Sequence, residues 1–209
     1  MGAVEATGKR ERTKQANRAA ILLAARDVFV EMGYGAATVR DIVRRTDLAS
    51  GTFYNYFPDK ESVFRALLEE TAREAAGRAH EARRAGTTTE AFVTDGFRAY
   101  FAMLVEDRAT FELVRRNAGT IRAMFDVPAI VAGIAAVIEQ LAGDLRDGIT
   151  AGLVPDHDTE LMAAAMSGTA FEVGVRMLED EPPDVERAAT FCADLFLGGL
   201  ERLGRRSAR

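Results

Sequence analysis

The sequence is poor in the side chains that most often carry catalysis, metal binding or covalent cross-links. Its 209 residues include one cysteine, two histidines and no tryptophan. Cys192 has no disulfide partner within the chain, and His80 and His157 do not have the spacing of metal ligands. Because a nucleophile–base pair and a glycine-rich phosphate loop are also lacking, the sequence does not favour an enzyme, and we expect no metal or cofactor. Cys192 lies in an apolar stretch, which predicts an inert, packed thiol.

The sequence also lacks a long hydrophobic run. No uninterrupted apolar segment approaches the ~20 residues that span a bilayer. Residues 1–12 are polar and have no apolar centre of the kind found in secretory signals. We therefore expect a cytoplasmic protein that does not associate with a membrane.

Positive charge is scarce overall but not at the start of the chain. The net charge is −5, which has the wrong sign for binding a nucleic acid. Residues 1–60 nevertheless carry ten Lys or Arg against seven Asp or Glu, a net charge of +3, and the remainder carries 17 against 25, a net charge of −8. Since a phosphate responds to charges within a Debye length of about 10 Å, this asymmetry favours a nucleic-acid face near the N-terminus.

Strand-like alternation of polar and apolar residues is missing, and apolar residues recur instead at helical spacing. The first such stripe is followed by Gly33, which predicts the end of a helix; it consists of Ile21, Ala25, Val28, Phe29 and Met32. The sequence predicts an all-α fold of about nine helices, in which a three-helix N-terminal domain precedes a larger C-terminal helical domain.

Breaks in the helical pattern set the expected boundaries. We expect a disordered basic tail over 1–12, a three-helix domain over 13–58, a linker helix over 59–84 and a larger helical domain over 85–209. In and beside the tail, Lys9, Arg10, Arg12 and Lys14 are either solvated charge or an arm that adds phosphate contacts.

Two short helices are expected within the N-terminal domain. Thr38 with Asp41 three residues later is typical of a helix start, because the two side chains satisfy free backbone donors. A second short helix is expected from Ser50 to Phe57, and Pro58 ends it and opens the next helix. Helices this short must pack on the first helix in order to fold.

The stretch from Thr38 to Lys60, TVRDIVRRTDLASGTFYNYFPDK, resembles the DNA-binding signature of the TetR family of repressors. Two positions depart from the family pattern: Asp47 replaces the turn glycine, and Ala49 replaces the serine that caps the recognition helix. We expect Asp47 to tolerate a positive φ and Ser50 to act as the cap. Residues in the family's order are Gly51, Thr52, Phe53, Tyr54, Tyr56, Phe57 and Lys60.

The resemblance implies a site for double-stranded operator DNA. Arg40 matches a position that reaches a base edge, and Lys60 matches a phosphate contact. The physical pattern agrees with this, because a small residue lies beside hydroxyl donors and opposite the apolar anchors Phe53 and Phe57. Alternatively, YNYF is a packing stripe, and Arg44 and Arg45 are a solvated helix face. The expected DNA-binding residues are Arg40, Ser50, Gly51, Thr52, Tyr54, Asn55, Tyr56 and Lys60.

For the C-terminal half, the resemblance implies a ligand cavity and a homodimer formed by the last two helices. Aromatic side chains with cations nearby in sequence suit an amphipathic anion, such as a fatty acyl thioester or an aromatic acid; structural core is the alternative for the same phenylalanines. The expected ligand-binding residues are Phe97, Phe101, Phe111, Arg115, Arg116, Asn117, Phe125 and Phe171. The expected dimer helices carry small residues and methionines over 161–177, and an apolar stripe of Phe191, Leu195, Phe196, Leu200 and Leu203. Internal core is the alternative for this stripe.

Together these features predict a ligand-responsive repressor that binds a near-palindromic operator as a dimer and is released by a small, largely apolar effector. The alternative is a DNA-binding regulator without small-molecule input, controlled by a protein partner.

Overall fold

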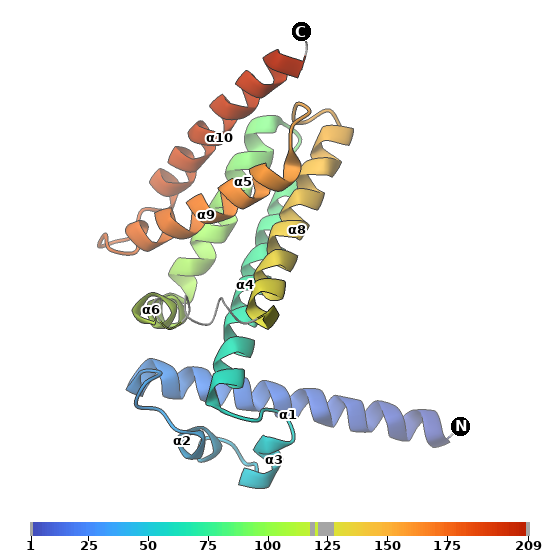
Figure 1. The fold of residues 1–209 in the computed structure, drawn as a ribbon, viewed down its shortest axis with the longest axis vertical. Helices are drawn as coiled ribbons and strands as arrows, with labels where there is room; N and C mark the ends of the chain where they lie inside the picture. The colour runs from blue at the N-terminus through green and yellow to red at the C-terminus, as the bar shows by residue number, and fades with distance from the viewer. Residues whose placement is uncertain (1, 118–119, 121–127, 208–209) are drawn as a thin grey trace. The chain divides into compact units, whose positions relative to one another are not determined.

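The computed structural model describes residues 2–117, 120 and 128–207, and this part of the chain contains nine α-helices and no strand (Figure 1). The predicted all-α class is therefore confirmed. The helices are α1 (Gly2–Met32), α2 (Val39–Val43), α3 (Ser50–Tyr54), α4 (Lys60–Ala85), α5 (Thr89–Glu106), α6 (Arg108–Arg116), α8 (Pro128–Thr150), α9 (Thr159–Met177) and α10 (Val185–Ser207).

The chain divides into two compact units. The described residues of 1–70 and 112–121 form unit 1, and those of 71–111 and 122–209 form unit 2. The boundary falls within α4, which gives its first turns to unit 1 and its remaining turns to unit 2. The predicted linker over 59–84 is thus one helix that takes part in both units.

Unit 1 is held together by aromatic side chains from α1, α3 and α4. Phe29, Phe53 and Phe64 are completely buried. The rings of Phe29 and Phe64 meet edge to face with centroids 5.5 Å apart, and Tyr34 packs on Phe64 at 4.4 Å. Gly33 has a φ of +78° directly after α1, a conformation that costs glycine little, so the predicted end of this helix is confirmed.

The N-terminal tail differs from its prediction. Residues 1–12 were expected to be disordered, but α1 already begins at Gly2 and runs without a break to Met32. The physical reason is the absence of proline from this stretch, which is rich in alanine, glutamate, lysine and arginine, all good helix formers.

The caps of the short helices were predicted with mixed success. Thr38 caps α2 in a capping box with Asp41, as expected, and the Thr38 hydroxyl lowers the pKa of the Asp41 carboxyl. The expected cap at Ser50 is wrong: Ser50 is the first residue of α3, and its N-cap, Ala49, makes no side-chain hydrogen bond. Asp47 needs no positive φ, since no residue other than glycine has one in the described chain.

The turn between α2 and α3 is stabilised by a hydroxyl group. Thr46 Oγ1 donates to the carbonyl of Val43 at 2.9 Å and accepts from the backbone N–H of Leu48 at 3.3 Å. This local bonding accounts for a turn without glycine. Helix α3 ends at Tyr54, earlier than predicted, and Pro58 lies before α4, whose first turn is capped by Asp59 through the backbone N–H and hydroxyl of Ser62 at 2.7 Å each.

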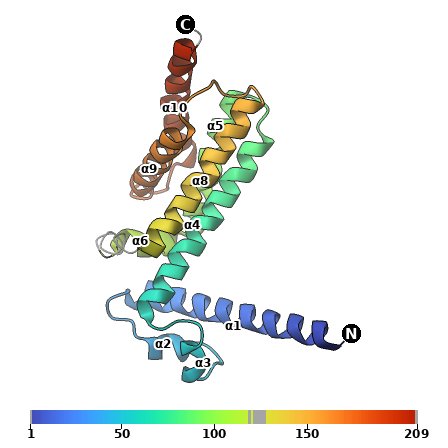
Figure 2. The ribbon, with the colours of Figure 1, turned by 45° about the vertical axis from the view of Figure 1, so that its right-hand side comes forward.

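Unit 2 is a helical bundle in which α5 lies along α10 and α8 packs on α9 (Figures 1 and 2). Phe97 stacks between Phe101, at 6.2 Å, and Phe196 of α10, at 5.7 Å. Cys192 is fully buried in the same core, and burial raises the pKa of its thiol to about 11, which favours the inert, protonated form. The pattern missed one break, at Asp107, which separates α5 from α6.

No helix in the described part of the chain is both long and apolar enough to cross a membrane.

Candidate nucleic-acid interface and C-terminal unit

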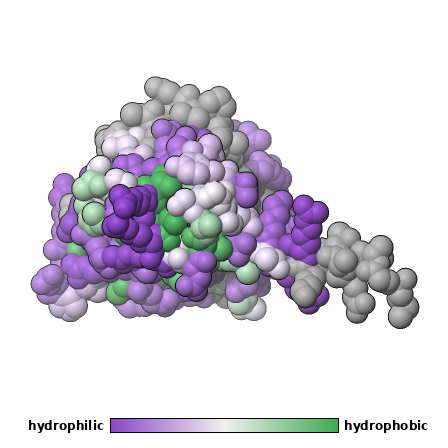
Figure 3. Space-filling view, turned by 90° about the horizontal axis from the view of Figure 1, so that it is seen from below, coloured by the Kyte–Doolittle hydropathy of each residue, from purple (hydrophilic) through white to green (hydrophobic). Residues whose placement is uncertain are grey.

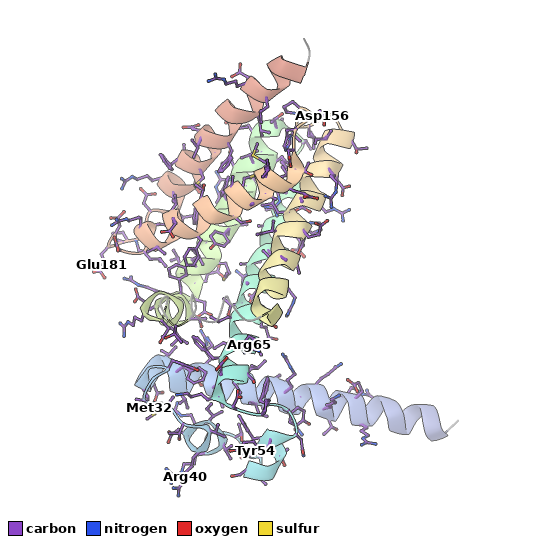
Figure 4. The ribbon with its side chains drawn as sticks, in the orientation of Figure 1. Met32, Arg40, Tyr54, Arg65, Asp156 and Glu181 are labelled. Atoms are coloured by element: carbon purple, nitrogen blue, oxygen red, sulfur yellow. The ribbon has the colours of Figure 1, made fainter. Side chains whose placement is uncertain are left out.

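In the α2–turn–α3 segment the aromatic side chains Phe53 and Phe57 are buried and the polar side chains lie on the outside. Phe53 and Phe57 are buried, whereas Arg40, Ser50 and Asn55 are exposed. Arg40 extends from α2 away from α1 (Figure 4), and the face that carries α2 and α3 is largely hydrophilic (Figure 3). The arrangement matches the expected division into apolar anchors and outward donors.

Gly51 and Tyr54 lie on the exposed part of α3. A Cβ added to Gly51 would meet no atom within 4 Å, so packing inside the chain does not require a glycine there. Tyr54 is 57% exposed although its ring meets Phe53 edge to face. Contacts within the chain therefore do not fully account for the residue type at these two positions. The same holds for the half-buried Thr52.

Tyr56 is tied to the first helix. Its hydroxyl accepts a hydrogen bond of 3.1 Å from Asn17 Nδ2, and the guanidinium of Arg18 lies over the ring of the next residue, Phe57, at 5.7 Å. The YNYF stretch thus has two roles. Tyr56 and Phe57 fix α1 to the segment that follows α3, while Tyr54 and Asn55 face outward.

Lys60 has partners that the sequence did not reveal. Its ammonium group donates to the backbone carbonyls of Tyr34 at 2.7 Å and Ala37 at 2.9 Å and lies 4.5 Å from the centre of the Tyr34 ring. These bonds close the loop between α1 and α2. In the structure the residue therefore holds unit 1 together, a role that differs from the phosphate contact expected for it.

Arg45 is also engaged within unit 1. Its guanidinium forms a two-pronged ion pair with Glu31 of α1, one bond of which measures 2.8 Å. Because both side chains are exposed, the pair adds little stability but restricts the direction of Arg45. Arg44, its neighbour, is exposed.

The predicted ligand-binding aromatics lie in unit 2. Phe97, Phe101 and Phe111 are buried, and Phe171 is 37% exposed with its ring centroid 6.4 Å from that of Phe111. Phe97 and Phe101 belong to the stacked core described above, which agrees with the alternative that they are structural. Tyr100, between them, has a pKa raised by burial, so its hydroxyl stays protonated.

The predicted cations near these aromatics are placed in unit 1. Arg116 is exposed and lies 3.4 Å from Glu112, and Asn117 Nδ2 donates to the carbonyl of Leu113 at 2.8 Å. Arg115 is part of α6. Phe125 lies outside the described residues. The expected grouping of these residues around one ligand stays a prediction.

A buried polar cluster in unit 2 was missed by the sequence analysis. Asp144 of α8 accepts a hydrogen bond of 2.7 Å from Arg83 Nε and lies 2.5 Å from Nδ1 of His80, both on α4. Arg83 and Asp144 are 7% and 5% exposed. Burial lowers the pKa of the Arg83 guanidinium, while Asp144 opposes that effect. No local pattern in the sequence connects Arg83 with Asp144, which lie 61 residues apart.

The last two helices have apolar side chains on their outer faces. Leu161 of α9 is 71% exposed, and Phe191 and Leu195 of α10 are 59% and 53% exposed. Phe196 and Leu200 point inward and are buried. The predicted stripe of the last helix is therefore split between a core side and an exposed side.

These features define a helix-turn-helix segment, formed by α2 and α3, followed by a C-terminal helical unit. Residues 21–67 match the model of the bacterial regulatory proteins of the tetR family. Over these residues the chain is similar to the TetR family, and the described architecture is that of solved TetR-family structures.

Individual relatives agree with this assignment. The transcriptional regulator RutR of Escherichia coli is 36% identical over 69 residues, which cover 33% of this chain and about a third of RutR. The fatty acid degradation regulator FadR of Bacillus halodurans is 25% identical, with a TM-score of 0.68 over 88% of this chain and 95% of that one. FadR of Bacillus subtilis in complex with stearoyl-CoA is 21% identical, with a TM-score of 0.65 over 84% and 95%. These three proteins are described as regulators.

The contacts of Lys60 generate a stability prediction. Replacing Lys60 with Met removes charged hydrogen bonds to the Tyr34 and Ala37 carbonyls, and we expect the free energy of unfolding to fall by about 1–3 kcal/mol. Urea denaturation measures the change, and the exposed Lys14→Met is the matched control, expected within about 0.5 kcal/mol of the parent protein. If the two variants are equally stable, the structural role of Lys60 is wrong.

Proposed function

We propose that this protein is a ligand-responsive repressor that binds a near-palindromic operator as a homodimer in the cytoplasm. The observation that supports it most is the set of outward polar side chains on α2 and α3, within the segment that matches the tetR family. A buried aromatic base fixes their direction, as a DNA-reading surface requires.

Each exposed residue has a proposed task on the DNA. Arg40 forms a bidentate contact with a guanine in the major groove, and Asn55 and Tyr54 contact base edges or phosphates nearby. Gly51 lets the backbone of α3 approach a phosphate closely, which agrees with the open space around it. Hydroxyl donors to the DNA come from Ser50 and Thr52 on α3 and from Tyr56, which follows α3.

The test of DNA reading is selection of bound sequences from a random duplex library. We expect the parent protein to enrich a two-fold symmetric motif. Arg40→Ala should enrich the same motif with one base position relaxed in each half-site and lose about 1–3 kcal/mol of affinity for the parent operator. Arg187→Ala, an exposed arginine on α10, serves as the control and should leave the motif unchanged. If selection with the parent protein enriches no sequence motif, the proposal is wrong.

The dimer is proposed to form through α9 and α10. One recognition helix buries too little surface for tight, specific binding, so two copies are needed. The outward side chains Leu161, Phe191 and Leu195 give both helices an apolar face, and exposed apolar patches of this kind mark interaction sites. Small exposed residues beside them, Gly168 on α9 and Gly198 and Gly199 on α10, allow close approach of a second copy.

A single charge on this face should separate the subunits. Because Leu195 is 53% exposed, Leu195→Glu leaves the core of unit 2 intact, but it places a charge in the proposed interface. Light scattering should then find a monomer that binds the selected operator much more weakly. Leu23→Glu makes the same change at an exposed leucine of α1 and should stay dimeric. A dimeric Leu195→Glu variant would move the interface elsewhere.

The effector is proposed to be a largely apolar, amphipathic anion, with a fatty acyl thioester as the first candidate. Within unit 2, its apolar part would contact Phe111 and Phe171, whose ring centroids lie 6.4 Å apart. Two relatives of similar fold support this choice, since one is described as a fatty acid degradation regulator and the other as a complex with stearoyl-CoA.

Two measurements test the effector. Native mass spectrometry of the purified protein should detect a retained small molecule, and stearoyl-CoA should weaken binding to the selected operator by about 5–150-fold, the range of ordinary allosteric coupling. Coenzyme A without the acyl chain is the control and should have little effect, because it lacks the apolar part. If no small molecule is retained and no acyl thioester changes the affinity, control by a protein partner replaces this proposal.

A further inference from the structure

The N-terminal half of α1 carries a row of cations that no part of the proposed reading surface uses. Arg10, Lys14 and Arg18 are spaced four residues apart on one continuous helix. Residues at this spacing share a helix face. Four residues rotate the helix by about 400°, which is only about 40° more than one full turn. Arg10 and Lys14 are exposed, and neither has an ion-pair partner within the described chain.

The contacts of α1 show which way this face points. Arg18 lies over the ring of Phe57, and Asn17 donates to the Tyr56 hydroxyl. Asn17 and Arg18 are about 100° apart around the helix, and Lys14 lies between them in angle. Tyr56 and Phe57 directly follow α3. The face with Arg10 and Lys14 is therefore the one that packs on the α3 segment, continued about 6–12 Å farther toward the N-terminus at 1.5 Å per residue.

Arg12 provides an internal comparison. It lies about 200° around the helix from Arg10, on the opposite side of α1. The two arginines differ by only two positions in sequence and by nothing in charge. They differ in the face that they occupy relative to the α3 segment.

We propose that Arg10 and Lys14 form a second DNA-contacting element, which binds backbone phosphates that flank the half-site read by α2 and α3. DNA is the partner that fits, since the row continues from the side of α1 that meets the reading segment, and two unpaired cations at one-turn spacing suit successive phosphates. The inference rests on the proposed function, because it requires that α3 docks on DNA.

The salt dependence of operator binding tests this element. Each phosphate contact contributes about 0.9 to the slope of log affinity against log salt concentration. Arg10→Ala should therefore reduce the slope of the dimer by about two units, and the double variant Arg10→Ala with Lys14→Ala by up to about four. Alanine is a good helix former, so α1 is kept, which circular dichroism checks.

Arg12→Ala is the matched control, and it should change the slope by less than half as much as Arg10→Ala. Hydroxyl-radical footprinting should show that the double variant loses protection outside the half-sites and keeps it within them. Equal slope changes for Arg10→Ala and Arg12→Ala, or an unchanged footprint, would overturn the proposal while leaving DNA binding itself intact. Failure of the parent protein to bind any DNA would instead overturn the proposed function.

Discussion

Helix α4 is the element on which the rest of the structure depends, because one uninterrupted helix is anchored in both units. Near its start, Phe64 is completely buried against Phe29 of α1. Near its end, Arg83 is buried against Asp144 of α8. A helix transmits displacement along its axis because every turn is bonded to the next. Each unit therefore packs on its own part of α4.

The second anchor, the buried Arg83–Asp144 ion pair, is sensitive to the loss of either partner. A buried ion pair gains little net stability over apolar packing, whereas removal of one partner costs about 3–5 kcal/mol because a charge stays buried alone. Its surroundings are fitted to it: a Cβ at Gly96 of α5 would lie 2.9 Å from Arg83 Cγ. Three helices thus depend on one charged pair, which specifies how α4, α5 and α8 pack. His80 Nδ1 is a second partner of the same carboxylate.

Much of the fold was predictable because it depends on neighbours in sequence. The Thr38 and Asp41 capping box and the stop at Gly33 are local devices, and both were confirmed. The helical extent of the tail and the Ala49 cap were missed, since helix continuation and cap choice are decided by small competing energies.

The parts of the site that escaped prediction all depend on distant pairs. Lys60 bonds to carbonyls 23 and 26 residues away, and Arg83 pairs with Asp144 across 61 residues. No pattern of period 3.6 contains such pairs. The last helix shows the same limit in another way, because a stripe of five apolar residues did not reveal that Phe196 turns inward and Leu195 outward.

We propose that DNA binding in unit 1 and the conformational state of unit 2 are coupled through α4, which takes part in both units. Amide hydrogen exchange along the chain, with and without saturating operator DNA, tests it most directly, because coupling requires that binding at one end alters the conformational ensemble at the other. We expect altered exchange in residues 60–70 and also in residues 78–85 and in α8 around Asp144. Altered exchange confined to residues up to Glu70 would contradict the claim.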